Sequence, residues 1–64
     1  MDRKTILKTI DYDLKAHIKI KTISDRFFYR GPIVYISDDA IVITDQKDGN
    51  VSFDLSDIDR VWRV

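Results

Sequence analysis

The sequence predicts a mainly β protein, with a short N-terminal helix followed by five strongly bent antiparallel strands that close into a small barrel. Three observations predict this class. β-Branched and aromatic residues recur at alternate positions in several short runs. The acidic residues are all Asp, which favours turns and caps over helix interiors. The links between runs are short, which makes consecutive strands antiparallel neighbours in a meander.

The first element, within residues 1–10, is expected to be a helix. Asp2 is suited to cap a helix that begins at Arg3, because its carboxylate can accept N–H groups of the first turn. An aliphatic stripe at helical spacing would dock this helix on the sheet: Ile6, Leu7, Ile10 and, one turn on, Leu14. The Thr and Ile content of the segment also permits a strand, so both alternatives stay open.

Residues 14–22 alternate between apolar and basic side chains, which is typical of a strand with one buried face. The expected core-facing residues are Leu14, Ala16, Ile18 and Ile20. The expected solvent-facing residues are Lys15, His17, Lys19 and Lys21.

Residues 26–45 read as two strands joined by an acidic turn at residues 37–39. Aromatic and aliphatic side chains at alternate positions around Gly31 are expected to share one face: Phe27, Tyr29, Ile33 and Tyr35. Gly31 and Pro32 interrupt the run. A glycine inside a strand marks a sharp bend or a close backbone approach, so one long strand is expected to serve two sides of the barrel.

The remaining chain predicts a hairpin loop, two strands and one tight turn. The loop is expected at residues 45–50, where Asp48-Gly49-Asn50 has strong turn chemistry. A strand follows at residues 51–55, and a 3₁₀ turn at residues 56–59 is expected to send Ile58 into the core. The last strand is expected at residues 60–64.

Size and composition favour one domain, residues 1–64, that gains stability by association. A chain this short buries little apolar surface, and it has no Cys for a disulfide or a thiolate metal site. The net charge is zero, but residues 1–30 carry +4 and residues 31–64 carry −4. Without an apolar run near 18 residues or a secretory signal pattern, we expect a cytoplasmic protein with no membrane partner.

Three segments resemble the Sm-like small β-barrels. Residues 29–33, Tyr-Arg-Gly-Pro-Ile, are similar to the second strand of that family, and residues 41–45 resemble its third strand. Residues 53–61 resemble the tail of YolD-like bacterial proteins. The resemblance covers about residues 14–64 and implies an SH3/Sm-like barrel, assembly through the outer strands and, often, RNA binding. The loop that holds a base in this family corresponds here to residues 37–40, which lack Asn and an aromatic ring.

Catalytic and cofactor chemistry has little support in the sequence. The single His, His17, lies between lysines on a polar strand face, and the chain has no Cys nucleophile. Asp38 and Asp39 are adjacent, so their side chains point in different directions and suit a solvated turn better than a paired-carboxylate site. The sequence therefore predicts a non-enzymatic protein with no cofactor and no metal.

Two sets of residues are candidates for binding a partner. Exposed aromatics beside arginine are typical of protein interfaces, and the set expected to bind a protein partner or a second copy is Phe28, Trp62 and Arg63. The alternative is an Sm-like protein that binds RNA or single-stranded nucleic acid through a basic row: Lys15, Lys19, Lys21, Arg26 and Arg30. A row of lysines also keeps a strand soluble and need not bind nucleic acid. The first hypothesis is therefore an adaptor or regulatory protein that binds a protein partner.

Overall fold

The structure, a computed structural model, describes residues 1–11, 16–24 and 28–64. Its elements in chain order are α1 (Arg3–Thr9), β1 (His17–Thr22), β2 (Phe28–Ile36), β3 (Ala40–Asp45), β4 (Gly49–Asp54), the 3₁₀ turn η1 (Leu55–Asp57) and β5 (Ile58–Arg63). The predicted helix and all five predicted strands are therefore confirmed, although β4 and β5 begin at Gly49 and Ile58, each two residues earlier than expected.

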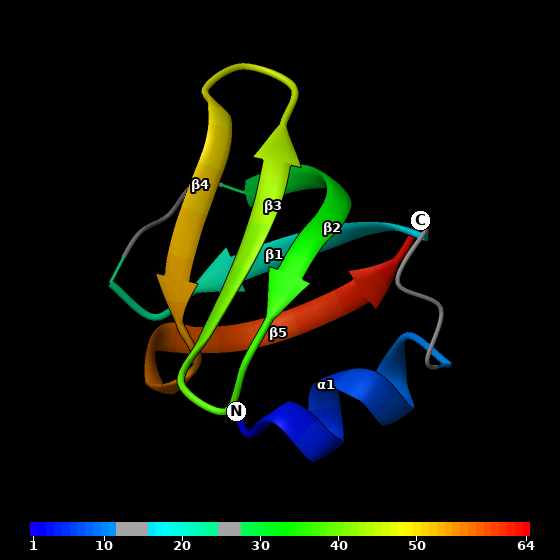
Figure 1. Ribbon diagram of the computed structural model, residues 1–64. Helices are drawn as coiled ribbons and strands as arrows, with labels where there is room; N and C mark the ends of the chain where they lie inside the picture. Colours follow the sequence, from blue (N-terminus) through cyan, green and yellow to red (C-terminus); the bar gives the residue numbers. More distant parts are fainter. Residues whose placement is uncertain (12–15, 25–27) are drawn as a thin grey trace.

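The five strands form one antiparallel sheet in the order β4-β3-β2-β1-β5 (Figure 1). The predicted meander holds from β1 to β4. It fails at β5, which crosses over through η1 to pair with β1 instead of β4. Because β4 and β5 form the two edges and are not hydrogen-bonded to each other, the sheet is open and the predicted closure into a barrel is not confirmed.

The sheet bends at Gly31, as the sequence predicts. The first half of β2 pairs with β1 through residues 28–32, and its second half pairs with β3 through residues 33–36. A side chain at Gly31 would collide with the carbonyl of Thr44 on β3. The backbones also meet next to the bend, where Gln46 N donates to Arg30 O over 3.2 Å. One strand therefore serves both halves of the sheet because a glycine permits this close approach.

The predicted alternation along β2 breaks after Ile33. Ile33 pairs with Ile43 but Tyr35 pairs with Val42, so Val34 is an extra residue in a β-bulge. The bulge turns the next side chain outward, and Tyr35 is 60% exposed. The expectation that Tyr35 shares a core face with Ile33 is therefore wrong.

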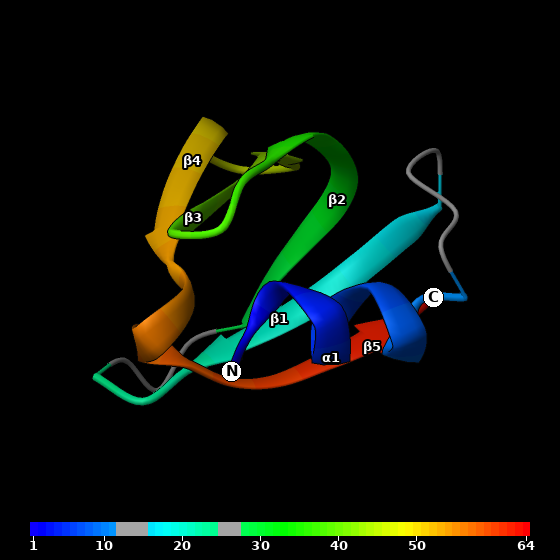
Figure 2. The ribbon, with the colours of Figure 1, turned by 60° about the horizontal axis from the view of Figure 1, so that its bottom comes forward.

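The core lies on the concave side of the bent sheet and consists mainly of isoleucines. Its fully buried members are Ile6, Ile10, Ile18, Ile20, Ile41 and Ile43. The helix contributes Ile6 and its C-cap contributes Ile10, and the helix packs against β5, which Figure 2 shows from below. The predicted apolar stripe of α1 is confirmed as far as Ile10, and Leu14 lies outside the described residues. Ile58 is buried as expected, although the 3₁₀ turn lies at Leu55–Asp57 and ends before it, whereas the sequence predicts the turn at residues 56–59.

The helix begins where the sequence predicts because Asp2 caps it. The Asp2 carboxylate accepts the N–H of Thr5 at 2.7 Å. Hydrogen bonding from the side chain of Thr5, together with this backbone bond, lowers the pKa of the Asp2 carboxyl below its ordinary value. At the other end of α1, Nη1 of Arg63 donates to the carbonyl of Ile10 over 3.5 Å, so β5 helps to hold the end of the helix.

Asp45 organises the hairpin between β3 and β4. Its side chain is buried, and one carboxylate oxygen accepts the N–H of Arg30 from β2 at 3.0 Å. The other oxygen accepts the N–H groups of Lys47 and Asp48 at 2.9 and 3.1 Å. The hydrogen bond from Arg30 and those from Lys47 and Asp48 lower the pKa of the Asp45 carboxyl, against the opposing effect of burial. This carboxylate therefore has a structural role in the turn.

Candidate functional site

The convex side of the β2-β1-β5 part of the sheet carries most of the residues that the sequence singled out. Strand pairing sets Lys19 of β1 between Arg30 of β2 and Trp62 of β5. Lys21 lies in the same way between Phe28 and Arg60. We name this surface the cationic face, and its members are His17, Lys19, Lys21, Phe28, Arg30, Arg60 and Trp62.

An aromatic pair occupies the centre of the cationic face. The rings of Phe28 and Trp62 lie 5.8 Å apart and are tilted by 49°. Nζ of Lys19 lies 4.5 Å from the centre of the Phe28 ring and 6.0 Å from that of Trp62. The guanidinium of Arg60 lies 5.5 Å from the Trp62 ring. These distances are within the range of cation–π attraction, so two cations and two rings form one connected cluster.

The rings point outward, as the sequence predicts. Phe28 is 47% exposed and Trp62 is half-buried. Neither belongs to the core cluster, so they do not pack in the core beneath the helix. A large apolar side chain that stays in solvent beside charged groups is available for contact with a partner.

The cationic face has a local charge of +3 at neutral pH. Its four Lys and Arg residues are offset by Asp59 at the rim, which lies 3.4 Å from Nζ of Lys21. The whole chain has no net charge, so a counterbalancing acidic excess lies elsewhere on the molecule. This basic surface combines Lys19, Lys21 and Arg30 of the first half of the sequence with Arg60 of the second half, so the charge difference between the two halves does not by itself account for it.

Arg63 does not belong to this surface. It pairs with the buried residue Ile18 and lies on the opposite side of β5, where it contacts the end of α1. Its expected place beside Phe28 and Trp62 is therefore wrong. Arg60 takes that place, and the sequence contained the signal for it: Arg60 is two residues from Trp62, which puts both on one face of a strand.

Residues of the predicted protein-partner set and of the predicted basic row lie together on the cationic face. Lys19, Lys21 and Arg30 of the basic row surround the aromatic pair. Lys15 and Arg26 of the same row lie outside the described residues. The protein-partner hypothesis and the nucleic-acid hypothesis therefore concern the same surface.

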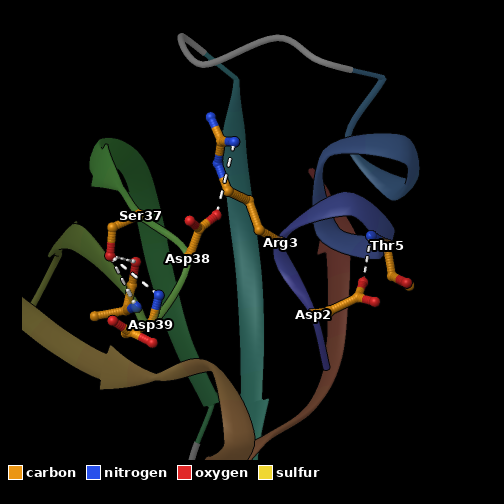
Figure 3. Close-up of polar contacts among 7 residues, drawn as sticks. Asp2, Arg3, Thr5, Ser37, Asp38 and Asp39 are labelled. Atoms are coloured by element: carbon orange, nitrogen blue, oxygen red, sulfur yellow. Dashed lines mark hydrogen bonds and ion pairs between the residues drawn. The ribbon is translucent and has the colours of Figure 1, made fainter.

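The acidic turn before β3 is a solvated turn, as expected. Figure 3 shows Asp38 pointing toward Arg3 of α1, at 4.0 Å, while Asp39 lies beside Ser37. The hydroxyl of Ser37 accepts the N–H groups of Asp39 and Ala40, which closes the turn. The two carboxylates do not converge, and the side chain of Asp38 is 91% exposed. Such a pair has neither the geometry nor the burial of an acid–base site.

A pocket of about 220 Å³ lies beside the cationic face, lined by Phe28, Tyr29, Asp45, Lys47 and Asp48. The Asp45 carboxylate is already bonded to three backbone N–H groups. The volume is below the 300 Å³ or so at which small-molecule sites begin. We therefore assign no ligand to this pocket.

In comparisons with known proteins, no family model, no curated protein and no solved structure matches the chain. Within residues 1–11, 16–24 and 28–64, no group of three or more His, Cys, Asp or Glu side chains is arranged to hold a metal ion. Within the same ranges, no helix has the length and apolar character needed to cross a membrane.

Proposed function

We propose that this chain is a non-enzymatic binding module that docks a protein partner on its cationic face and also self-associates. The observation that carries the proposal is the exposed Phe28–Trp62 pair, with rings 5.8 Å apart, inside a border of basic side chains. Protein interfaces concentrate their binding energy in such central aromatic and Arg residues, while a polar rim excludes water. The matching partner presents an apolar group surrounded by carboxylates.

The ring geometry favours a protein over stacked bases. Lys19 lies over the Phe28 ring and Arg60 lies over the Trp62 ring, so a base would have to displace a cation before it could stack. Carboxylates of a protein partner could instead pair with these cations where they are, and the ring edges would remain open to apolar contact.

The experiment is affinity capture from extracts of the source cells, comparing the wild-type protein with the Phe28→Ser variant. Because truncation of a central aromatic residue costs about 2 kcal/mol or more, we expect retention of the partner to fall about tenfold or more. Ile23→Ser, at an exposed apolar residue outside the cationic face, is the matched control. Equal retention by Phe28→Ser and the wild type would contradict the proposal.

Direct binding can be followed with the identified partner, because Trp62 is the only Trp in the chain. We expect its fluorescence to change as the cationic face is covered. Saturable binding that leaves Trp62 emission unaltered would place the partner on another surface.

Single-stranded nucleic acid is the second candidate, favoured by the presence of the aromatic pair and four basic side chains on one face. If four phosphates contact those side chains, the logarithm of affinity for oligo-U should fall with the logarithm of salt concentration with a slope of about −3. Lys19→Ala should reduce this slope by about 0.7, whereas Lys4→Ala on the exposed side of α1 should not alter it. Absence of a fluorescence anisotropy change at about 50 mM salt would eliminate this candidate.

We also propose that the fold belongs to the SH3/Sm-like class of small barrels. The order of one short helix and five strands supports this assignment, as does the strand that bends at Gly31 to serve both halves of the sheet. An experimental structure in which β4 and β5 approach each other across the open side would support it, and a flat sheet would oppose it.

A further inference from the structure

A second outward surface lies on the other half of the bent sheet. It is formed by the second half of β2 together with β3 and β4, where Val42 pairs with both Tyr35 and Ser52, and Thr44 pairs with Asn50. We name it the uncharged face, and its members are Val34, Tyr35, Val42, Thr44, Asn50 and Ser52. Among the outward positions of these described strand segments only Asp54 is charged, and it lies at the end of the face.

The lack of charge is unusual for this chain, in which 34% of residues are charged. Two polar groups of the uncharged face are already paired, since the Thr44 hydroxyl donates to Oδ1 of Asn50 at 2.7 Å. Covering the face would therefore not leave that hydroxyl without an acceptor, so the desolvation cost of the hydroxyl would be small.

A β-bulge exposes the apolar part of this surface. The extra residue Val34 lets Tyr35 leave the core side of β2, and the two side chains are 55% and 60% exposed. Without the bulge, Tyr35 would continue the buried series of Ile33, and its ring would be removed from water. Bulges that redirect a side chain occur next to functional sites, so the outward Tyr35 indicates a contact surface.

We propose that the uncharged face is the surface through which a second copy of this chain binds. This inference deepens the self-association part of the proposed function and rests on it. In a two-fold dimer each copy presents the same patch, so like charges on that patch meet and repel. Two cationic faces, each with a charge of +3, would repel each other, whereas two uncharged faces would bring Tyr35 and Val34 of both copies together without that cost.

The size of the molecule limits the strength of this contact. One whole side of a molecule with extents of 25 × 22 × 17 Å offers roughly 400–500 Å² per copy, and the uncharged face covers only one half of the sheet, so the contact is at the weak end of specific interfaces. We therefore expect a dissociation constant on the order of 100 µM. The dimer would then form only at high local concentration, for example when both copies are bound to one partner.

The test is sedimentation equilibrium of the wild-type chain from about 10 µM to about 1 mM, a range chosen to bracket the weak affinity. We expect a monomer–dimer equilibrium. Tyr35→Lys and Ser52→Lys each introduce like charges across the two-fold axis and should raise the dissociation constant at least about tenfold. Ser52 is exposed, so this second variant keeps the test valid even if Tyr35→Lys disturbs the fold. Phe28→Lys, which adds the same charge to the cationic face, should leave the dissociation constant unchanged.

The possible failures can be told apart. A wild-type chain that remains monomeric at about 1 mM would overturn both the self-association and this inference. A wild-type dimer that persists unchanged in Tyr35→Lys and Ser52→Lys would overturn only the choice of surface. A dimer whose formation alters Trp62 fluorescence and is disrupted by Phe28→Lys would assign self-association to the cationic face instead. Capture of a protein partner that depends on Phe28 is independent of all three results.

Discussion

Asp45 connects three backbone segments through one carboxylate. It accepts N–H groups from Arg30, Lys47 and Asp48, and so ties the middle of β2 to the turn between β3 and β4. Asp45→Asn keeps a single acceptor oxygen and leaves backbone donors without a partner. We expect it to lower the free energy of unfolding by about 2 kcal/mol at neutral pH, measured by urea denaturation.

The effect of Asp45 should depend on pH in a defined direction. The hydrogen bonds hold the pKa of this carboxyl in the folded protein below its ordinary value of 3.8. The contribution of the Asp45 carboxylate to the free energy of unfolding is therefore fully present above pH 3.8. It is lost as the pH falls through the lower pKa of this carboxyl in the folded protein. The difference in the free energy of unfolding between the wild type and Asp45→Asn should decrease as the pH falls below 3.8. A difference that stays constant down to about pH 2 would show that the carboxylate's charge is not involved.

Thr22, unlike Asp45, is a buried polar residue that is expected to reduce the stability of the fold. It is only 3% exposed, and among the residues that the structure describes its hydroxyl has no hydrogen-bond partner. Thr22→Val replaces this hydroxyl with a methyl group of similar size and removes the cost of burying it. We expect the free energy of unfolding to rise by about 1 kcal/mol. The same change at Thr44, whose hydroxyl is exposed and bonded to Asn50, is the control and should give no gain. A loss of stability in Thr22→Val would reveal a polar partner of the hydroxyl.

At the scale of the elements, the bend of β2 depends on Gly31. A methyl group there would collide with the carbonyl of Thr44, and the backbone of β3 cannot move away without breaking its pairing. We expect Gly31→Ala to reduce the free energy of unfolding by about 3 kcal/mol, as overpacking in a rigid region does.

Gly49 provides the matched comparison for Gly31. It has a positive φ of 75°, but nothing lies within 4 Å of the position that a Cβ would occupy. Gly49→Ala should therefore cost only the backbone strain, roughly 1 kcal/mol. Equal losses in the two variants, compared by urea denaturation, would mean that β3 adapts freely to a side chain at the bend.

At the scale of the whole molecule, the open sheet has three interior strands and two edges. β1, β2 and β3 have hydrogen-bonded neighbours on both sides, whereas β4 and β5 each have one. We expect amide hydrogen exchange in dilute solution to be slower in the interior strands than in β4 and β5, by about tenfold or more. Protection of β4 and β5 that rises with protein concentration would indicate edge-to-edge pairing between copies, and therefore a different assembly from the one proposed.

Much of this architecture could be predicted because its causes are local. Asp2 caps a helix whose apolar spacing is visible in the sequence, and Gly31 marks the bend that it permits. The outward positions of Phe28 and Trp62 also follow from alternation along single strands. Where alternation failed, at Tyr35, the cause was the register between β2 and β3, which depends on residues of another strand.

The candidate site could be predicted only in part for a related reason. The sequence indicates which side chains of each strand face solvent, but it does not indicate which strands are neighbours. The pairing of β5 with β1 brings Trp62 and Arg60 next to Lys19 and Lys21, and it sends Arg63 to the helix. A meander that continued to β5 would have separated these groups by the width of the sheet.

The sequence by itself therefore determined the elements, the bend and the exposure of the aromatic pair, because helix capping, side-chain alternation and glycine sterics act over a few residues. Only the tertiary structure decided that the rings and the cations share one convex face, and that a neutral surface with Tyr35 lies on the other half of the sheet. The physical reason is that strand order and register depend on which distant segments bury their apolar faces together, and no single segment carries that information.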